Sequence, residues 1–230
     1  IEDFKPEPEP SPNIEDFEDG VVAIPFDTDF SSIEFAIYPN FARSPVTLSF
    51  ELYTSSGQIV SAKNSHIRVG TSTDKLAYVD LIEMFSEHKN SVTKGMVRMI
   101  CLGNGSVPAR MKFGLNFCKP TSDTNLPSNI CFNAQVPNDK ILLKPETFHW
   151  CAIFDANSQK IYLHNSSFVK SGFSGAEIDI EVYRSSDRES LNWSTMLPYN
   201  GTIDILEDQA ESVDSFLRGN IGWITFTCSS

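Results

Sequence analysis

Short runs of alternating apolar and polar residues dominate this sequence. Residues 46–53 place Val46, Leu48, Phe50 and Leu52 on one face of an extended chain. Period-two alternation predicts β-strands, and many such runs between Gly, Pro, Asn and Ser predict an antiparallel sandwich or barrel. The predicted strands are residues 33–38, 46–53, 58–62, 66–69, 96–102, 111–118, 130–136, 148–154, 160–163, 176–183, 201–206 and 221–228.

One or two short helices are expected in the connections between these strands. The first covers residues 73–88, begins at Thr73 or Asp74, and carries apolar residues three to four positions apart. A second helical turn is expected within residues 207–217, ended by Gly219. Because strands and helices do not alternate regularly, an α/β nucleotide-binding fold is disfavoured. The apolar positions of the first helix, at residues 73–88, are Leu76, Val79, Ile82 and Phe85.

The predicted fold class is all-β, an antiparallel jelly-roll sandwich.

The charge of the chain lies mainly at its N-terminal end. Its 230 residues carry 18 Lys and Arg against 30 Asp and Glu, a net charge of −12, of which −7 falls in the first 20 residues. That segment also holds four of the prolines, so residues 1–19 are predicted to be an extended acidic arm before a single jelly-roll domain at 20–230. An acidic chain without a basic stripe argues against broad nucleic-acid binding, and no apolar run is long enough to span a membrane.

Metal and cofactor chemistry finds little support in the sequence. The five cysteines show no CxxC spacing, and the histidines are scattered, so no zinc site and no cofactor are predicted. His149 and Cys151 fall on one strand face as a conceivable thiol–imidazole pair, although a buried structural cysteine is the favoured interpretation. Asp27 and Asp29 could hold a cation, but a turn is favoured there.

The segment 176–182 carries the sharpest chemical pattern. In a strand, Glu177, Asp179 and Glu181 point to one face and the intervening aliphatic residues to the other. This string resembles the signature of laminarinase/lichenase-type β-glucanases, which implies Glu177 as nucleophile, Asp179 as the tuning residue and Glu181 as acid/base of a retaining mechanism. No tryptophan adjoins the motif along the chain. The favoured interpretation is therefore a solvated strand face, with catalysis as the alternative.

The overall arrangement resembles the jelly-roll coat proteins of picorna-like RNA viruses, such as plant secoviruses of the cheravirus type or insect picorna-like viruses. The resemblance rests on the helix at 73–88 after the first strands, the long strand pair at 96–102 and 110–120, the last strand at 221–228, the N-terminal arm and a start that is not Met. It implies a polyprotein product without catalytic activity, made in the host cytoplasm and located in the virion.

As a coat protein, the chain would assemble with copies of itself and with sister subunits into an icosahedral shell. Its acidic arm implies that enclosed RNA is contacted weakly or indirectly, and neither a membrane nor a small-molecule substrate is expected as a partner. A non-catalytic binding module is the further alternative. An apolar loop is predicted at 191–201, either an interface or folded over its own core. The predicted subunit-interface residues are Phe4, Phe17, Phe30, Phe41, Trp150, Phe173, Trp193 and Tyr199.

Overall fold

The computed structural model describes residues 20–37, 46–69, 77–103, 112–119, 128–133, 146–166 and 175–229. These residues form antiparallel strands with short helices between them, which confirms the all-β prediction. The strands are β1 Gly20–Asp27, β2 Ser32–Ile37, β3 Val46–Thr54, β4 Ile59–Val69, β5 Ala77–Asp80, β6 Lys94–Gly103, β7 Lys112–Cys118, β8 Ser128–Asn133, β9 Glu146–Ile153, β10 Tyr162–His164, β11 Ala176–Arg184, β12 Ser190–Leu197, β13 Thr202–Asp204 and β14 Gly222–Ser229. The helices are α1 Leu81–Met84, the 3₁₀ turn η1 Ser86–His88 and α3 Ala210–Leu217.

Strands β1 to β8 form the first half of the molecule. They make two four-stranded sheets, with the orders β1-β6-β3-β4 and β5-β2-β7-β8. One hydrophobic cluster joins the facing sides of the two sheets. At its centre the Phe35 ring of β2 stacks on Phe113 of β7 at 4.9 Å and meets Phe50 of β3 edge-on at 5.7 Å. The first half is therefore a two-sheet sandwich with an aromatic core.

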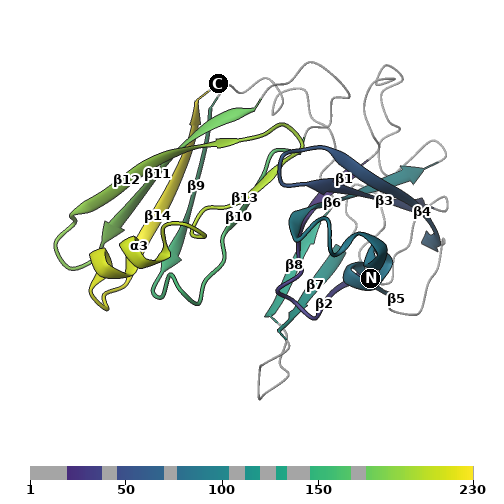
Figure 1. The fold of residues 1–230 in the computed structure, drawn as a ribbon, viewed down its shortest axis with the longest axis horizontal. Coiled ribbons are helices and arrows are strands. Elements are labelled where there is room, and N and C mark those ends of the chain that lie inside the picture. The colour runs from purple at the N-terminus through teal and green to yellow at the C-terminus, as the bar shows by residue number, and fades with distance from the viewer. Residues whose placement is uncertain are drawn as a thin grey trace, which may run out of the picture.

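Strands β9 to β14 form the second half, which has a core of its own. One sheet has the order β12-β11-β14-β9, and β10 pairs with β13 as a two-stranded ribbon. Helix α3 supplies Val213 and Leu217 to a second hydrophobic cluster, together with Ile180 and Ile224 of the sheet. Figure 1 shows this sheet at the left, the first half at the right, and β10 and β13 between them.

The two halves repeat one strand order. Strands β1 to β6 form the sheet β4-β3-β6-β1 and the pair β5–β2, and β9 to β14 form the sheet β12-β11-β14-β9 and the pair β13–β10. A helix comes after the fifth strand of each set, α1 after β5 and α3 after β13. Each of these six strands, and the helix after the fifth, thus has an equivalent in the other half. Among the described residues the halves differ beyond these six strands, because β7 and β8 extend the first half.

Equivalent residues make equivalent contacts in the two halves. Asp80 ends β5 and accepts a hydrogen bond from the Ile33 amide of β2, at 3.4 Å. Asp204 ends β13 and accepts one from the Ile161 amide just before β10, at 3.3 Å. Each carboxylate also accepts from the amide two residues ahead, at 2.9 and 3.3 Å. In each half, therefore, an equivalent aspartate links the two paired strands to the residues that follow it in the chain.

The helix predicted at 73–88 is wrong in part. Residues 77–80 form β5, whose Val79 pairs with Phe35 and is buried, and the helix begins only at Leu81, where Asp80 caps it. Pairing with β2 overrides the helical spacing of the apolar residues. The helical turn expected within 207–217 is confirmed as α3, which Arg218 and Gly219 end with positive φ angles of 52° and 76°.

The remaining fold predictions have mixed outcomes. The loop predicted at 191–201 is wrong over most of its length, because Ser190–Leu197 is the edge strand β12. Strand β1 was not predicted. Residues 1–19, the predicted arm, lie outside the described residues, and the single domain at 20–230 stays a prediction beside the observation of two hydrophobic clusters.

Candidate functional site

The acidic motif lies on the outer face of the second half's sheet. Glu177 and Asp179 are exposed and Glu181 is half-buried, while the alternating residues of β11 face the core. The Asp179 carboxylate accepts a hydrogen bond from the Ser194 hydroxyl of β12 at 2.7 Å, and Glu181 accepts one from the Tyr183 hydroxyl. That bond raises the pKa of Tyr183. The predicted solvated face is present, with two of its three carboxylates held by neighbours.

Two tryptophans lie on this same face although they are distant from the motif in sequence. Trp150 of β9 and Trp223 of β14 are 61% and 44% exposed. Their ring centroids lie 5.1 Å apart in an edge-to-face arrangement. The strand order brings them beside the carboxylates, since Glu181 pairs with Thr225 and Thr225 pairs with Trp150. We call this surface, formed by Glu177, Asp179, Glu181, Tyr183, Trp150 and Trp223, the tryptophan face.

The equivalent face of the first half is more deeply buried. Strand register matches Glu181 and Tyr183 to Glu51 and Tyr53, and Trp223 to Met96. Tyr53 donates to Glu51 at 2.8 Å, as Tyr183 does to Glu181, and burial together with this bond raises the pKa of Tyr53 to about 12. Met96 is 0% exposed against 44% for Trp223. The tryptophan face is therefore more exposed than the equivalent surface of the first half.

Polar contacts join the two halves at the ends of β1 and β10. Lys160 binds Asp27 at 2.5 Å and Asp29 at 2.7 Å, and the Tyr162 hydroxyl donates to Asp27 at 2.5 Å. Burial alone would raise the pKa of Asp27, but the Lys160 and Tyr162 hydrogen bonds outweigh it and hold the pKa below its ordinary value. Residues 28 and 29 form the turn that the sequence favoured. The cation that binds both Asp27 and Asp29 is the side-chain ammonium of Lys160.

A backbone contact also joins the halves. Gly57, after β3, has a φ of +87°, and a Cβ there would lie 1.9 Å from the Tyr199 carbonyl oxygen of the second half. Nearby, the Thr202 amide donates to the Ser55 carbonyl at 3.1 Å. The turn after β3 therefore lies so close to the backbone of the second half that residue 57 has no room for a side chain.

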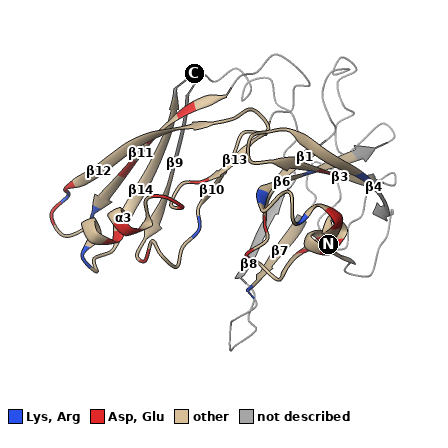
Figure 2. Cartoon of the chain, viewed as in Figure 1, with Lys and Arg blue, Asp and Glu red and all other residues tan. Residues whose placement is uncertain are grey.

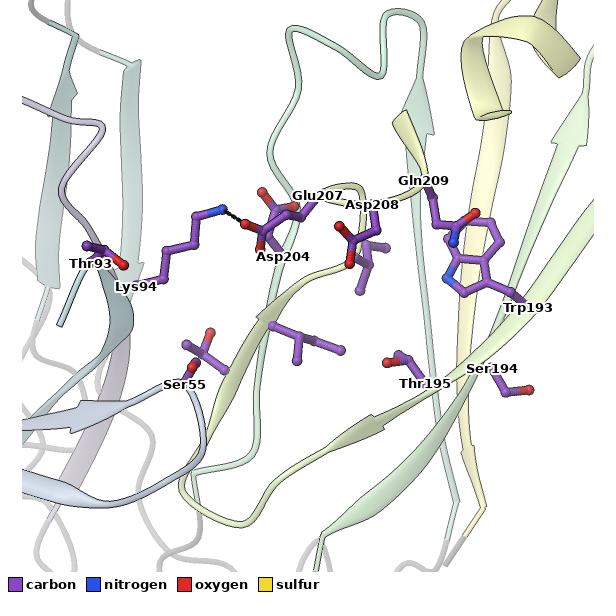
Figure 3. Close-up of a pocket in the computed structure, with 13 residues that line it drawn as sticks. Ser55, Thr93, Lys94, Trp193, Ser194, Thr195, Asp204, Glu207, Asp208 and Gln209 are labelled. Carbon is purple, nitrogen blue, oxygen red and sulfur yellow. Dashed lines mark hydrogen bonds and ion pairs between the residues drawn. The ribbon is translucent and has the colours of Figure 1, made fainter. Parts of the chain in front are cut away.

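A pocket of about 500 Å³ lies along the junction of the halves (Figure 3). Lys94 reaches it from the first half and forms an ion pair with Glu207 of the second. Asp204 and Asp208 add carboxylates, and the Trp193 ring closes one end beside Gln209 (Figure 3). This lining suits small polar or cationic molecules. Glu177, Asp179 and Glu181 do not line it, so the predicted catalytic carboxylates and this pocket are separate.

The predicted interface residues have different surroundings. Phe4, Phe17, Phe41 and Phe173 lie outside the described residues. Phe30 packs on Phe117 at 5.1 Å, and Trp193 packs partly against the second core. Tyr199 is half-buried in the turn before β13, so Trp150 is the one member of the predicted set with a largely exposed described side chain.

Other predicted chemistry gains no centre from the described residues. Burial raises the pKa of Cys151, which disfavours a reactive thiolate, and the His149 side chain is not among those described. Within the described ranges, no three His, Cys, Asp or Glu side chains gather as a metal site, and no helix has the length and apolarity to cross a bilayer. Comparison with protein-family models, curated proteins and solved structures finds no match for the chain.

Proposed function

We propose that the protein is a structural subunit of a shell, of the kind formed by the coat proteins of picorna-like viruses, and has no catalytic role. The observation that carries this proposal is the tryptophan face. It leaves Trp150 and Trp223 exposed, whereas Met96, the equivalent of Trp223, is fully buried in the first half. Exposed aromatic side chains grouped on a sheet face are typical of protein-interaction surfaces.

The strand order supports a jelly-roll architecture for each half. In a jelly roll, the second to seventh strands alternate between two sheets, pairing second with seventh, seventh with fourth, fourth with fifth, and third with sixth. Strands β1 to β6 and β9 to β14 both have this pattern. In the first half, β7 pairs with β2 as an eighth strand pairs with a third. Jelly rolls are frequent in shell proteins, although the fold alone does not assign the function.

The charge distribution fits protein partners better than nucleic acid. Lys, Arg, Asp and Glu lie together in α3 and the turns beside it, and other charged residues lie in the first half (Figure 2), while the tryptophan face carries carboxylates. A net charge of −12 disfavours extensive phosphate contacts, so RNA inside a shell would be bound weakly or by other subunits. The proposed partners are copies of this chain and sister coat subunits.

Assembly of the full chain tests the proposal. Light scattering over a range of concentrations and electron microscopy of material from the native source should show large closed particles. Replacing Trp150 and Trp223 by Ser should weaken assembly by roughly tenfold or more, as for anchor residues. Ile59→Ser is the matched control, since Ile59 is 56% exposed on β4 and lies off this face. A chain that stays monomeric in both settings would overturn the proposal.

A glycan-binding module is the second candidate, because the tryptophan face combines aromatic rings with hydrogen-bonding carboxylates. Aromatic faces pack on apolar sugar surfaces while carboxylates accept from hydroxyls. This candidate predicts that the monomer binds neutral oligosaccharides on a glycan array and that Trp223→Ala abolishes binding. Absence of binding to any neutral glycan would remove it.

The retaining β-glucanase stays a prediction from the sequence. A retaining pair needs carboxyl groups about 5–5.5 Å apart on either side of the scissile bond. Hydrolysis of mixed-linkage and β-1,3-glucans, lost in Glu177→Gln, would support it. An absence of turnover by the wild-type chain would remove it.

A further inference from the structure

In the first half, Glu51 and Tyr53 share a cation that their own sheet supplies. Arg98 of β6 lies directly opposite Glu51 of β3. The Oε2 atom of Glu51 accepts hydrogen bonds from the Tyr53 hydroxyl at 2.8 Å and from Nη1 of Arg98 at 3.4 Å. The Arg98 side chain is only 8% exposed. A guanidinium therefore pairs with this carboxylate where water has little access.

The second half keeps the carboxylate and the phenol but has no cation at the equivalent position. The Tyr183 hydroxyl donates to Glu181, as in the equivalent pair of the first half. The residue opposite Glu181 on β14 is Thr225, which takes the place of Arg98. The described outer-face residues of β9, β11, β12 and β14 include no Lys and no Arg. Within the described part of this face, the charge of Glu181 consequently has no counterion.

A large and a small side chain have changed places between the two sheets. In the first half, Arg98 is flanked on β1 by Ala23. In the second half, Thr225 is half-buried and lies between Glu181 on β11 and Trp150 on β9. Neighbouring strands are about 4.8 Å apart, so the Cα atoms of Glu181 and Trp150 are roughly 9–10 Å from each other. A short side chain thus separates a carboxylate from an exposed aromatic ring.

We propose that the tryptophan face binds an arginine side chain of a basic protein partner over Thr225, between Glu181 and Trp150. The guanidinium then takes in the second half the place that Arg98 takes in the first. Its N–H groups donate to the Glu181 carboxylate while its flat face packs on the Trp150 ring. This inference rests on the proposed function and deepens it by naming the chemistry of the partner at one contact.

Arginine fits this position better than lysine or a neutral group. A planar guanidinium stacks on an indole and donates to a carboxylate at the same time, whereas an ammonium is compact and strongly hydrated. Tryptophan is also the aromatic side chain that attracts cations most strongly. Exposed Glu177 and Asp179 add negative charge to the same face. The face therefore combines the two groups that recognise a guanidinium.

The net charge of the chain favours a basic sister subunit over a copy of this chain as the partner. Each copy carries a net charge of −12. Two such chains repel each other, and the carboxylates of the tryptophan face add to that repulsion wherever a second acidic surface approaches. A partner with arginine on its surface is attracted instead.

A pair of peptides tests whether the ligand must be a cation. The probe is a blocked peptide of sequence Arg-Ser-Arg-Ser-Arg, and in its control each arginine is replaced by citrulline, which keeps the shape but is neutral. Titration of the full chain is followed by the indole N–H resonances of Trp150 and Trp223. The arginine peptide should bind at least about tenfold more tightly at low salt, and added salt should reduce the difference. Equal affinities, or binding of neutral oligosaccharides in place of the arginine peptide, would overturn the proposal.

Variants of the full chain test the position of the site. Thr225→Arg supplies the guanidinium from within the sheet, as Arg98 does in the first half. It should weaken binding of the arginine peptide by about tenfold or more, as should Glu181→Gln. Glu211→Gln is the matched control, because it removes the same charge from an exposed residue of α3, on the core side of the sheet, and should change the affinity by less than about twofold.

Retained affinity in both Thr225→Arg and Glu181→Gln would overturn the site, and the titration of the wild type does not depend on either variant folding. The proposed function and this inference can fail separately. Binding of the arginine peptide by a chain that never forms particles would remove the shell function and keep the arginine site. Particles that assemble equally well from the wild type and from both variants would keep the shell function and remove this contact from the assembly.

Discussion

The two halves of the molecule share a strand order but differ in closure. In the first half, β7 and β8 extend the second sheet to four strands, whereas in the second half the described ribbon has two. The shared contacts of Asp80 and Asp204 show that pairing within each set of six strands obeys the same rules. Within the described residues, the halves therefore share one six-strand pattern and differ in the strands β7 and β8 that join it in the first half.

The outer faces of the two large sheets also differ in exposure, and the face of the second half is the more exposed. Residues at equivalent positions, such as Met96 and Trp223, are buried in the first half and exposed in the second. Their inward neighbours remain apolar and buried in both halves. A repeated sheet can thus keep its core while its outer face is either buried or exposed.

The largest expected difference concerns equivalent core residues of β2 and β10. Phe35→Ala should lower the free energy of unfolding by about 3–5 kcal/mol, because Phe35 is fully buried among aromatic rings. Leu163→Ala should lower it by only about 1–2 kcal/mol in the monomer, since Leu163 is partly exposed. Urea unfolding measures both. Equal losses would contradict the difference in closure.

The contact between the halves should produce the next largest effect. Asp27→Asn should lower the free energy of unfolding by about 2–4 kcal/mol, because it leaves Lys160 without its buried partner. The depressed pKa means that this stabilisation is present above the ordinary carboxyl value of 3.8 and is lost as pH falls through the lower folded value. Thermal unfolding from pH 7 to pH 2 should show the variant losing less stability than the wild type.

Asp29→Asn is the control for this contact. Asp29 binds the same ammonium, but its side chain is 65% exposed, so its loss should change stability by less than about 1 kcal/mol. If Asp29→Asn were as damaging as Asp27→Asn, burial of the Asp27 pair would not explain the effect.

His164 should make the second half sensitive to mild acid. Burial lowers its pKa to about 4, and its buried Nδ1 has no hydrogen-bond partner among the described residues. The unfolded chain takes up this proton at a pH near 6.5, so stability should fall by about 1–3 kcal/mol between pH 6.5 and pH 4. His164→Gln should flatten that part of the curve. An unchanged slope would show that His164 is not the titrating group.

The smallest effect is expected on the tryptophan face. Trp223→Ser should destabilise the isolated chain by only about 1–2 kcal/mol, because 44% of its side chain is already exposed. The equivalent change Met96→Ser should destabilise by about 2 kcal/mol or more, since Met96 is fully buried. Similar values for both variants would contradict the difference between the outer faces.

Alternation of apolar and polar residues was sufficient to predict most of the strands. It failed where a different constraint decided the structure. Residues 77–80 have helical spacing, but pairing with β2 makes them a strand, and Asp80 moves the start of the helix to Leu81. The apolar residues of β12 suggested a loop, although Leu191 and Trp193 alternate with polar neighbours as an edge strand requires.

The repeat and the tryptophan face were not predicted because their signals are not local. Identity between the halves is concentrated in short matches, such as Glu51 and Tyr53 against Glu181 and Tyr183, each with two serines shortly after it. Trp150 and Trp223 meet only through the pairing of β9 with β14. Comparing the two strand patterns segment by segment could have found the repeat, whereas the aromatic pair required the sheet register.

The contact between Gly57 and Tyr199 has a consequence for any assembly of this chain. Because a Cβ at residue 57 would overlap the Tyr199 carbonyl, the angle between the halves depends on the absence of a side chain. A larger residue there must tilt one half away from the other. In a closed array of many subunits, a tilt of a few degrees repeated at every position changes the radius of curvature, so this glycine would help to determine the size of the particle.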